Sequence, residues 1–292
     1  MTVSMDMIKD LRQRTGAGIM ECKEALKASD NNMEGAADYL RKKGITKAAK
    51  KADRNTKEGA VRAVVKGGVA AMIEAKCETD FVARNDKFQN FVAGLAEHLL
   101  AASEVASDEE FLSQPFVGGA SGMVVRDVIT NSVTELGENI VLGRRAKVAL
   151  EGPGLLTSYI HGVGNIGVLV RLDTDSSQTA EKPEVAELGR DLAMQIAAMK
   201  PIALRQDQIP QETIDKEKEI FAAQARESGK PENIIPKIVE GSVKKFLAES
   251  LLPMQAFVKD NKKTVDAVVK EVAAKAGGKI EVKSFIRYEL GE

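Results

Sequence analysis

The 292-residue sequence contains the same order of predicted elements twice, and this duplication restricts the possible folds more than any other feature. The first copy begins with segments 60–65 and 69–77, which alternate apolar with small or polar residues on either side of a Lys-Gly-Gly turn. This pattern predicts a β-hairpin. Two amphipathic helices, over 88–99 and 124–136, and a third strand over 144–150 complete the copy.

The second copy starts with predicted strands over 155–161 and 166–172, joined by a glycine-rich turn. A helix over 185–199 follows, and a helix over 265–272 and a strand over 279–288 come last. We therefore expect two similar antiparallel sheets, each with helices packed on one face.

Residues 201–240 interrupt the second copy. They contain two helical stretches joined by the turn sequence Ser-Gly-Lys-Pro, and their apolar residues are enough for one narrow seam but not for a core of their own. Because such a pair of helices cannot bury much surface alone, we expect a helical hairpin that protrudes or contacts a partner.

Three short stretches near the N-terminus carry apolar residues at helical spacing, over 8–11, 19–26 and 33–40. Gly44 is placed to end the third helix as a C-terminal cap. The residues that follow are rich in Lys and Arg and almost free of large apolar side chains, which is typical of a solvated linker or an exposed helix.

Taken together, these patterns predict an α+β protein. Residues 1–54 form a three-helix module with a basic connector, and residues 55–151 form the first core subdomain. The second core subdomain comprises residues 152–200 and 241–292, and the inserted helical hairpin lies between its parts.

Composition argues against several classes of protein. The 42 basic and 43 acidic side chains leave a net charge of −1, so no overall positive field attracts nucleic acid. Cys22 and Cys77 form neither a disulfide framework nor a zinc ribbon. His98 and His161 are too few for a three-histidine zinc site and make histidine-based catalysis difficult to assemble. We expect a protein that is not an enzyme, with no catalytic residue, bound metal or cofactor.

Apolar stretches are all too short to span a bilayer, which needs about 18 residues or more. Near the N-terminus, charges at Asp6, Lys9, Asp10 and Arg12 interrupt the apolar run that a secretory signal requires. We expect a cytoplasmic protein that does not contact a membrane.

Gly162, Gly164 and Gly167 satisfy the spacing G-x-G-x-x-G of dinucleotide-binding folds. In those folds the last glycine opens a helix, whereas here Gly167 leads into the apolar strand sequence Val-Leu-Val. A glycine-containing hairpin turn explains the motif better, and a nucleotide-dependent oxidoreductase is one alternative function.

Five lysines of the connector could bind phosphates: Lys42, Lys43, Lys47, Lys50 and Lys51. No aromatic residue lies among them to stack on bases, so a solvated face is the favoured interpretation. A ribosome-associated RNA-binding protein is the second alternative function. For the histidines, we expect His98 at the surface or its boundary and His161 at the end of a strand beside a turn.

Thr79, Asp80, Phe81 and Val82 lie between a predicted strand and a predicted helix. From the pattern alone, Phe81 is expected in the core with Asp80 capping the helix. The alternative is an exposed aromatic side chain beside a carboxylate, which is typical of a residue that enters a partner's pocket.

Four motifs carry a resemblance to a known family: RQRTGAGIMECKEAL at 12–26, CETDFVARND at 77–86, IGVLV at 166–170 and FIRYELGE at 285–292. In this order they resemble bacterial elongation factor Ts. The resemblance implies a ubiquitin-associated-like N-terminal module, a two-part core and a helical hairpin that some members use to dimerise. It also implies guanine-nucleotide exchange on the GTPase elongation factor Tu, with no small-molecule substrate, and a homodimer through residues 201–240.

The resemblance also assigns residues. Thr79, Asp80, Phe81 and Val82 match the family stretch that enters the GTPase near its magnesium site and disturbs metal and phosphate binding, with Phe81 as the wedge.

Leu11, Arg12, Ile19 and Met20 match a surface for a helix of the GTPase nucleotide domain. His161 and Gly162 match a turn that faces the far domain of the GTPase. Asn165 departs from the family, because many members carry a basic residue there.

Overall fold

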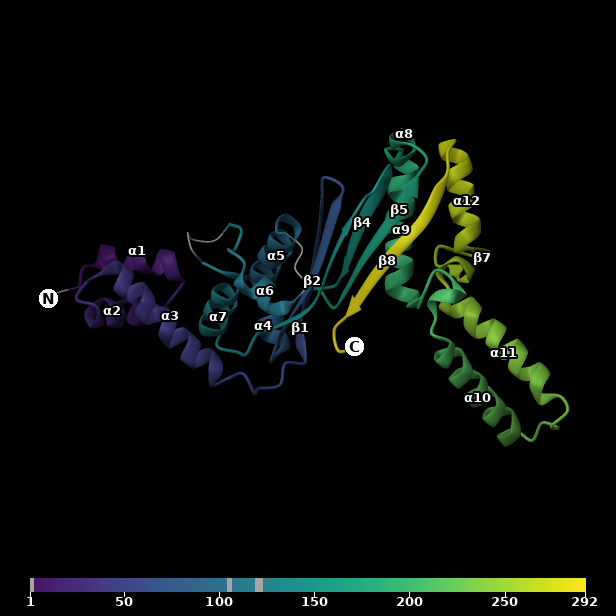
Figure 1. Ribbon diagram of the computed structural model, residues 1–292, viewed down its shortest axis with the longest axis horizontal. Helices are drawn as coiled ribbons and strands as arrows, with labels where there is room; N and C mark the ends of the chain where they lie inside the picture. The colour runs from purple at the N-terminus through teal and green to yellow at the C-terminus, as the bar shows by residue number, and fades with distance from the viewer. Residues whose placement is uncertain (1–2, 104–106, 119–122) are drawn as a thin grey trace. The chain divides into compact units, whose positions relative to one another are not determined.

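The computed structural model describes residues 3–103, 107–118 and 123–292 (Figure 1). Contacts divide these residues into two units. Unit 1 contains the described residues up to Val148, together with Ile160–Gly167 and Tyr288–Glu292, and unit 2 contains Ala149–Tyr159 and Val168–Arg287. Among the described residues, no helix is both long and apolar enough to cross a membrane.

The three predicted N-terminal helices are present: α1 (Met5–Thr15), α2 (Ile19–Ala28) and α3 (Met33–Ala49). Side chains start two of them, since Ser4 Oγ accepts from Met7 N and Asn32 Oδ1 accepts from Gly35 N. Their apolar faces form a small core of Ile8, Leu11, Cys22, Ala25, Leu26 and Ala36.

Gly44 does not end the third helix, contrary to the expectation from the sequence. It is buried inside α3, where an added Cβ would lie 3.4 Å from Thr130 Cγ2 and 3.5 Å from Thr134 Oγ1 of α7 (Val125–Leu136). The glycine therefore allows α3 to approach α7 closely. Beyond the helix, Lys51 Nζ donates to the carbonyl oxygen of Gly137 at 2.6 Å, so the connector is also bonded to the carboxyl end of α7.

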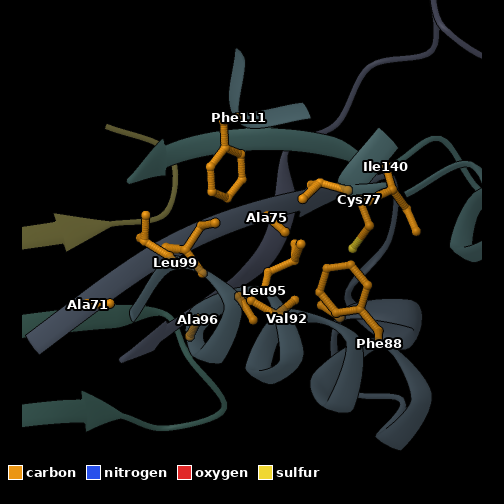
Figure 2. Close-up of a cluster of buried hydrophobic side chains, with 14 of the residues drawn as sticks. Ala71, Ala75, Cys77, Phe88, Val92, Leu95, Ala96, Leu99, Phe111 and Ile140 are labelled. Atoms are coloured by element: carbon orange, nitrogen blue, oxygen red, sulfur yellow. The ribbon is translucent and has the colours of Figure 1, made fainter. Parts of the chain in front are cut away.

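The first sheet has the order β1 (Glu58–Lys66), β2 (Val69–Cys77), β3 (Val141–Ala149). Strands β1 and β2 are antiparallel and form the predicted hairpin, with Lys66 paired to Val69. Helix α5 (Asp86–Ala101) packs on these two strands. In Figure 2, side chains of α5 and of the sheet point toward one another: Phe88, Val92, Leu95, Ala71, Ala75 and Cys77, all fully or almost fully buried.

A buried ion pair joins β2 to β3 in unit 1. Glu74 is fully buried, and its two carboxylate oxygens accept from Nε and Nη2 of Arg144, each at 3.0 Å. Gly143 leaves the space that this carboxylate fills, because a Cβ there would lie 2.5 Å from Glu74 Oε2. Arg144 also donates to the carbonyl oxygen of Glu289 at 2.6 Å, and its guanidinium lies 4.7 Å from the ring centre of Tyr288.

His98 is fully buried, so the expectation of a surface histidine is wrong. Its Nδ1 accepts from Val117 N at 3.2 Å and its Nε2 lies 3.1 Å from Gln114 Oε1. The ring also stacks on Phe116 and meets Phe111 edge-on. A histidine inside a helix pattern can bury its ring when partners from a distant loop satisfy both nitrogens, and those partners have no signal at the histidine's own position.

Unit 2 contains most of the second sheet, whose order β4 (Gly154–His161), β5 (Ile166–Thr174), β8 (Ile280–Glu289) repeats that of the first. Helices α8 (Ser177–Ala180), α9 (Pro183–Met199) and α12 (Val265–Ala276) belong to this copy. Strands β6 (Ala256–Phe257) and β7 (Asp260–Thr264) add a small antiparallel pair. The α+β class and the duplicated order are confirmed. In unit 1, α4 (Asp80–Ala83) and α6 (Asp108–Ser113) supplement the predicted helices.

The insertion forms a helical hairpin of α10 (Gln211–Glu227) and α11 (Ile235–Ser250), which lie side by side (Figure 1). The second helix continues past residue 240, where the sequence placed the end of the insertion. Short 3-10 turns, η1 (Gln206–Gln208) and η2 (Leu252–Met254), flank the pair. The division into domains stays a prediction.

The hairpin is attached to unit 2 through a small apolar root. Its buried members are Ala203, Ile209, Ile214 and Leu251, with Val243 and Leu247 packed against them. Next to this root, Gln255 Nε2 donates to the carbonyl oxygens of Met199 and Glu249, so one buried amide joins the ends of α9 and α11.

We predict that His98 makes stability depend on pH. Burial lowers the pKa of His98 from its ordinary value of 6.5, and the bond to Gln114 opposes this only in part. Below pH 6.5 the unfolded histidine therefore gains a proton that the folded one refuses, so its contribution is complete above that pH and is lost as the pH falls toward the lowered folded pKa.

The measurement is denaturant unfolding of wild type and His98→Leu across this range. The free energy of unfolding of the wild type, relative to that of His98→Leu, should fall as the pH falls. A difference that stays constant with pH would contradict the assignment.

Removing the outer part of the hairpin should leave the rest folded. Replacing residues 218–242 with a short Gly/Ser linker keeps Ile214, Val243 and Leu247 at the root. The free energy of unfolding of the remaining chain should then change little, because the apolar root of the hairpin is kept. As a comparison, deletion of residues 211–250 also removes Ile214, Val243 and Leu247 from the root and should destabilise unit 2. Equal damage from both deletions would show that the outer hairpin belongs to the core.

Candidate functional site

The most exposed large apolar side chain in the described structure lies in the motif at 79–82. Phe81 has 83% of its surface exposed and sits on α4, a single helical turn. The burial expected from the pattern alone is therefore wrong. The ring is exposed, as the alternative expected, and its contact with a partner stays a prediction. Thr79, not Asp80, caps the turn, since its Oγ1 accepts from Val82 N at 3.3 Å.

The backbone before this turn is held by one carboxylate. Glu138 Oε2 accepts from the backbone nitrogens of Glu78 and Thr79, both at 3.0 Å, and its Oε1 accepts from Thr79 Oγ1 at 2.6 Å. These are charge-assisted bonds, which are stronger than bonds between neutral groups. Glu138 follows Gly137, whose left-handed φ of 82° ends α7 and turns the chain toward Thr79.

A second carboxylate makes the reverse contact, from the segment before the turn to the loop after α7. Glu78 Oε1 accepts from Asn139 N at 2.6 Å, and the buried side-chain amide of Asn139 donates to the carbonyl oxygens of Ala52 and Arg54. The Arg54 guanidinium lies 3.4 Å from Glu78. Three separate segments, the connector, the end of β2 and the loop after α7, thus meet behind the exposed turn.

Cys77 adds an anchor on the buried side of the turn. Its Sγ donates to the carbonyl oxygen of Thr79 at 3.3 Å. Burial first, and then the charge of Glu138, raise the pKa of the Cys77 thiol to about 12. The expectation of a small buried residue is confirmed for Cys77 and for Cys22, and both cysteines are free thiols.

The glycine motif forms a hairpin turn between β4 and β5, as expected. Gly162 has a left-handed φ of 60°, and the carbonyl oxygen of Gly164 accepts from Val61 N at 2.8 Å. A Cβ at Gly167 would lie 2.4 Å from Val61 Cγ1. In the described structure Gly167 is the second residue of β5 and does not open a helix, so the strand-to-helix turn that holds a pyrophosphate is missing at this motif.

Gln89 brings this hairpin turn and the Phe81 turn together within unit 1. Its Nε2 donates to the carbonyl oxygen of Ala83, at the end of α4, and to that of Val163 at 3.1 Å. His161 and Gly162 are exposed on the same hairpin turn. No sequence motif identifies Gln89, Glu138 or Asn139, because their contacts join segments that lie far apart in the chain.

The candidates of the N-terminal module divide into exposed and buried residues. Met20 is 74% exposed and Ile19 48% exposed, and Arg12 is also exposed. Leu11 has no exposed surface, because its side chain packs inside the three-helix core. The expectation that Leu11 contacts a partner is corrected accordingly: it supports the surface from within.

Three of the five connector lysines have partners inside unit 1: Lys43 bonds to Glu24 at 2.7 Å, Lys47 bonds to Glu21, and Lys51 bonds to Gly137. The hydrogen bond from Lys47 lowers the pKa of Glu21, which keeps that partner charged. On α3, Lys43 and Lys47 are therefore already paired with acidic side chains of α2. Within the described residues, no group of three or more His, Cys, Asp or Glu side chains is placed to hold a metal ion.

Comparison with known proteins gives a consistent result over the whole chain. A family model described as elongation factor TS matches residues 78–292. The elongation factor Ts of Lawsonia intracellularis is 42% identical over 296 residues, covering 100% of both chains. That of a Nitratiruptor species is 44% identical over 294 residues, covering 100% of this chain and 94% of the relative, and that of a Nostoc species is 42% identical over 294 residues, covering 99% and 93%.

These relatives are translation elongation factors by name, and the present fold is the α+β arrangement expected from the motifs. The chain belongs to the elongation factor Ts family.

Proposed function

We propose that this protein binds the GTPase elongation factor Tu and promotes exchange of its GDP for GTP. The observation that carries the proposal is Phe81, an aromatic side chain held 83% exposed on a backbone that three segments fasten from behind. A large aromatic side chain in water is unfavourable unless a partner covers it, and such residues dominate binding at protein interfaces.

The proposed mechanism is the insertion of residues 79–82 near the magnesium site of the GTPase. Phe81 acts as the wedge, and Thr79, Asp80 and Val82 shape the turn that carries it. Asp80 is exposed, so its carboxylate is available to disturb the coordination of the metal in the partner. No covalent chemistry in this chain is needed, and the protein acts as a binding factor without a cofactor or small-molecule substrate of its own.

Thermodynamic linkage explains how binding releases nucleotide. The factor binds the empty GTPase more tightly than the GDP-bound form, and GDP then weakens the factor to the same degree. A thousandfold faster release needs about 4 kcal/mol of preferential stabilisation. One inserted aromatic side chain together with loss of metal coordination can supply that amount.

Two further surfaces belong to the proposed interface. Ile19, Met20 and Arg12 of the N-terminal module face solvent and offer contact area for a helix of the GTPase nucleotide domain. His161 and Gly162, on the β4–β5 turn, are exposed for contact with another domain of the same partner.

The hairpin of α10 and α11 is a second proposed contact, between two copies of this chain. Its surface away from the root is mostly charged, with Ile220 and Ile234 exposed. Sedimentation of the full chain and of the chain lacking residues 218–242 tests a homodimer at this site. We also expect the protein to work in the cytoplasm, where translation takes place.

The two alternatives from other classes are disfavoured by particular observations. The G-x-G-x-x-G residues lie in a strand-to-strand turn, and three connector lysines already have partners. Calorimetric titration with GDP, NAD and RNA separates the three functions. The exchange factor should bind none of them at micromolar concentration, whereas it should bind nucleotide-free elongation factor Tu.

Replacing Phe81 with Ala should abolish most of the exchange activity without unfolding the protein. Because the ring is exposed, its loss should change the free energy of unfolding by about 0.5 kcal/mol or less. Loss of a binding contact worth about 2 kcal/mol should slow stimulated GDP release about 30-fold. GDP release from elongation factor Tu and denaturant unfolding are measured on the same preparation.

Two control variants show what loss of a buried ring and loss of an unrelated exposed side chain do in the same measurements. Phe88→Ala removes a fully buried ring and should cost about 3–5 kcal/mol of stability. Val258→Ala removes an exposed apolar side chain of unit 2 and should leave both properties unchanged. Full exchange activity in folded Phe81→Ala protein would refute the wedge.

Met20→Ala should weaken binding to the GTPase while leaving the fold intact. Its side chain is 74% exposed, so a loss of about 1 kcal/mol, or about fivefold in Kd, is expected from binding alone. Met5→Ala is the matched control, because Met5 is an exposed methionine of the same module outside the proposed surface. Equal affinities for Met20→Ala, Met5→Ala and wild type would exclude Met20 from the interface.

A further inference from the structure

We propose that Glu138 is a positioning residue for exchange: its carboxylate orients the turn at 79–82 so that Phe81 is presented to the partner. The inference rests on the exchange function proposed above and goes further, because it assigns a role to a residue far from the motif in sequence. Glu138 itself is half-buried behind the turn.

The turn cannot hold its own orientation. Helix α4 has only four residues, Asp80–Ala83, which is too short for helical hydrogen bonding to stabilise it alone. Its direction in space must therefore come from bonds and packing that reach it from other segments.

Packing of the Phe81 ring does not provide that orientation. The ring is 83% exposed, Asp80 is exposed, and the salt bridge from Asp80 to Arg84, at 3.7 Å, joins residues of the same short segment. On the core side, Val82 is half-buried and Ala83 is buried, which fixes the end of the turn but not its beginning.

Glu138 fixes the beginning. Its carboxylate takes three donors from the two residues that precede α4, namely the backbone N–H groups of Glu78 and Thr79 and the hydroxyl of Thr79. The same hydroxyl oxygen accepts from Val82 N, so a chain of hydrogen bonds runs from Glu138 through Thr79 into the helical turn. Hydrogen bonds from N–H groups to a carboxylate are stronger than those between neutral groups. Without Glu138, the three donors have no other described partner in the protein.

The loop that carries Glu138 is hydrogen-bonded to two other segments of unit 1. Asn139, the next residue, donates its backbone N–H to Glu78 Oε1 at 2.6 Å, so Glu78 and Glu138 hold one another's segments reciprocally. Asn139 also bonds to the connector at Ala52 and Arg54. The loop after α7 thus supports the turn, and Glu138 is the residue of this loop that accepts hydrogen bonds from Thr79, directly before α4.

The expected signature is a loss of rate rather than of affinity. In Glu138→Ala, the maximal rate of GDP release at saturating factor should fall about tenfold, since displacement of a working group by about 1 Å can cost about a hundredfold. The factor concentration giving half the maximal rate should change little, because the N-terminal surface is untouched. A residue that only stabilised the fold would shift the unfolding midpoint and leave the maximal rate of the folded fraction unchanged.

A double-mutant cycle with Phe81→Ala tests whether Glu138 acts through the ring. Once the ring is absent, its orientation no longer matters, so the double variant should be no slower than Phe81→Ala alone. Glu138→Gln keeps the shape and one accepting oxygen, and it should recover part of the rate. Glu109→Ala is the control, because Glu109 is an exposed carboxylate of unit 1 that pairs with Arg126 instead. Independent, multiplicative losses in the cycle would overturn the proposal.

Hydrogen exchange at the backbone amides of Thr79 and Val82 provides a readout that does not require activity. Both amides should lose protection in Glu138→Ala, lose less of it in Glu138→Gln, and keep it in Glu109→Ala. Unchanged protection would overturn the proposal even if exchange were slow. If the wild type itself failed to accelerate GDP release, the proposed function would fall, and lost protection in the variants would still establish that Glu138 holds the turn.

Discussion

The bidentate pair of Glu74 and Arg144 is the interaction on which unit 1 depends most. A carboxylate with no exposed surface must be neutralised, and removing one member of such a pair typically costs about 3–5 kcal/mol. The pair joins β2 to β3 and requires the glycine at 143. Through Glu289 and the Tyr288 ring, the same guanidinium also holds the final residues of the chain against this sheet.

The ion pair between β2 and β3 also stabilises the segments that carry the exposed turn. Strand β2 carries Glu74 at its buried centre and leads directly into residues 79–82, while β3 follows the loop that contains Glu138 and Asn139. The segments that the ion pair joins are therefore the segments that orient Phe81. An exposed aromatic side chain acts on a partner efficiently only if its position is set in advance, since a displacement of about 1 Å can lower the rate about a hundredfold.

Much of the fold followed from the pattern of apolar residues. The three N-terminal helices, both hairpins and the duplicated order were predicted because each depends on periodicity within one segment. Gly44 and His98 were misjudged for the opposite reason: Gly44 contacts α7, and the partners of the His98 ring come from the segment after α5. Neither contact leaves a trace in the residues next to it.

The candidate site shows the same limit. The motif at 79–82 was visible in the sequence, and its family resemblance favoured an exposed ring where the local pattern favoured a buried one. Only the tertiary structure decided the matter, because exposure of Phe81 depends on Val82 and Ala83 filling the core contact and on Glu138 holding the backbone from 59 residues away. By itself the sequence determined which elements form and which residues are chemically able to act. The packing of distant segments determined which of those residues reach the surface, since burial is a property of the whole fold and not of any one stretch of it.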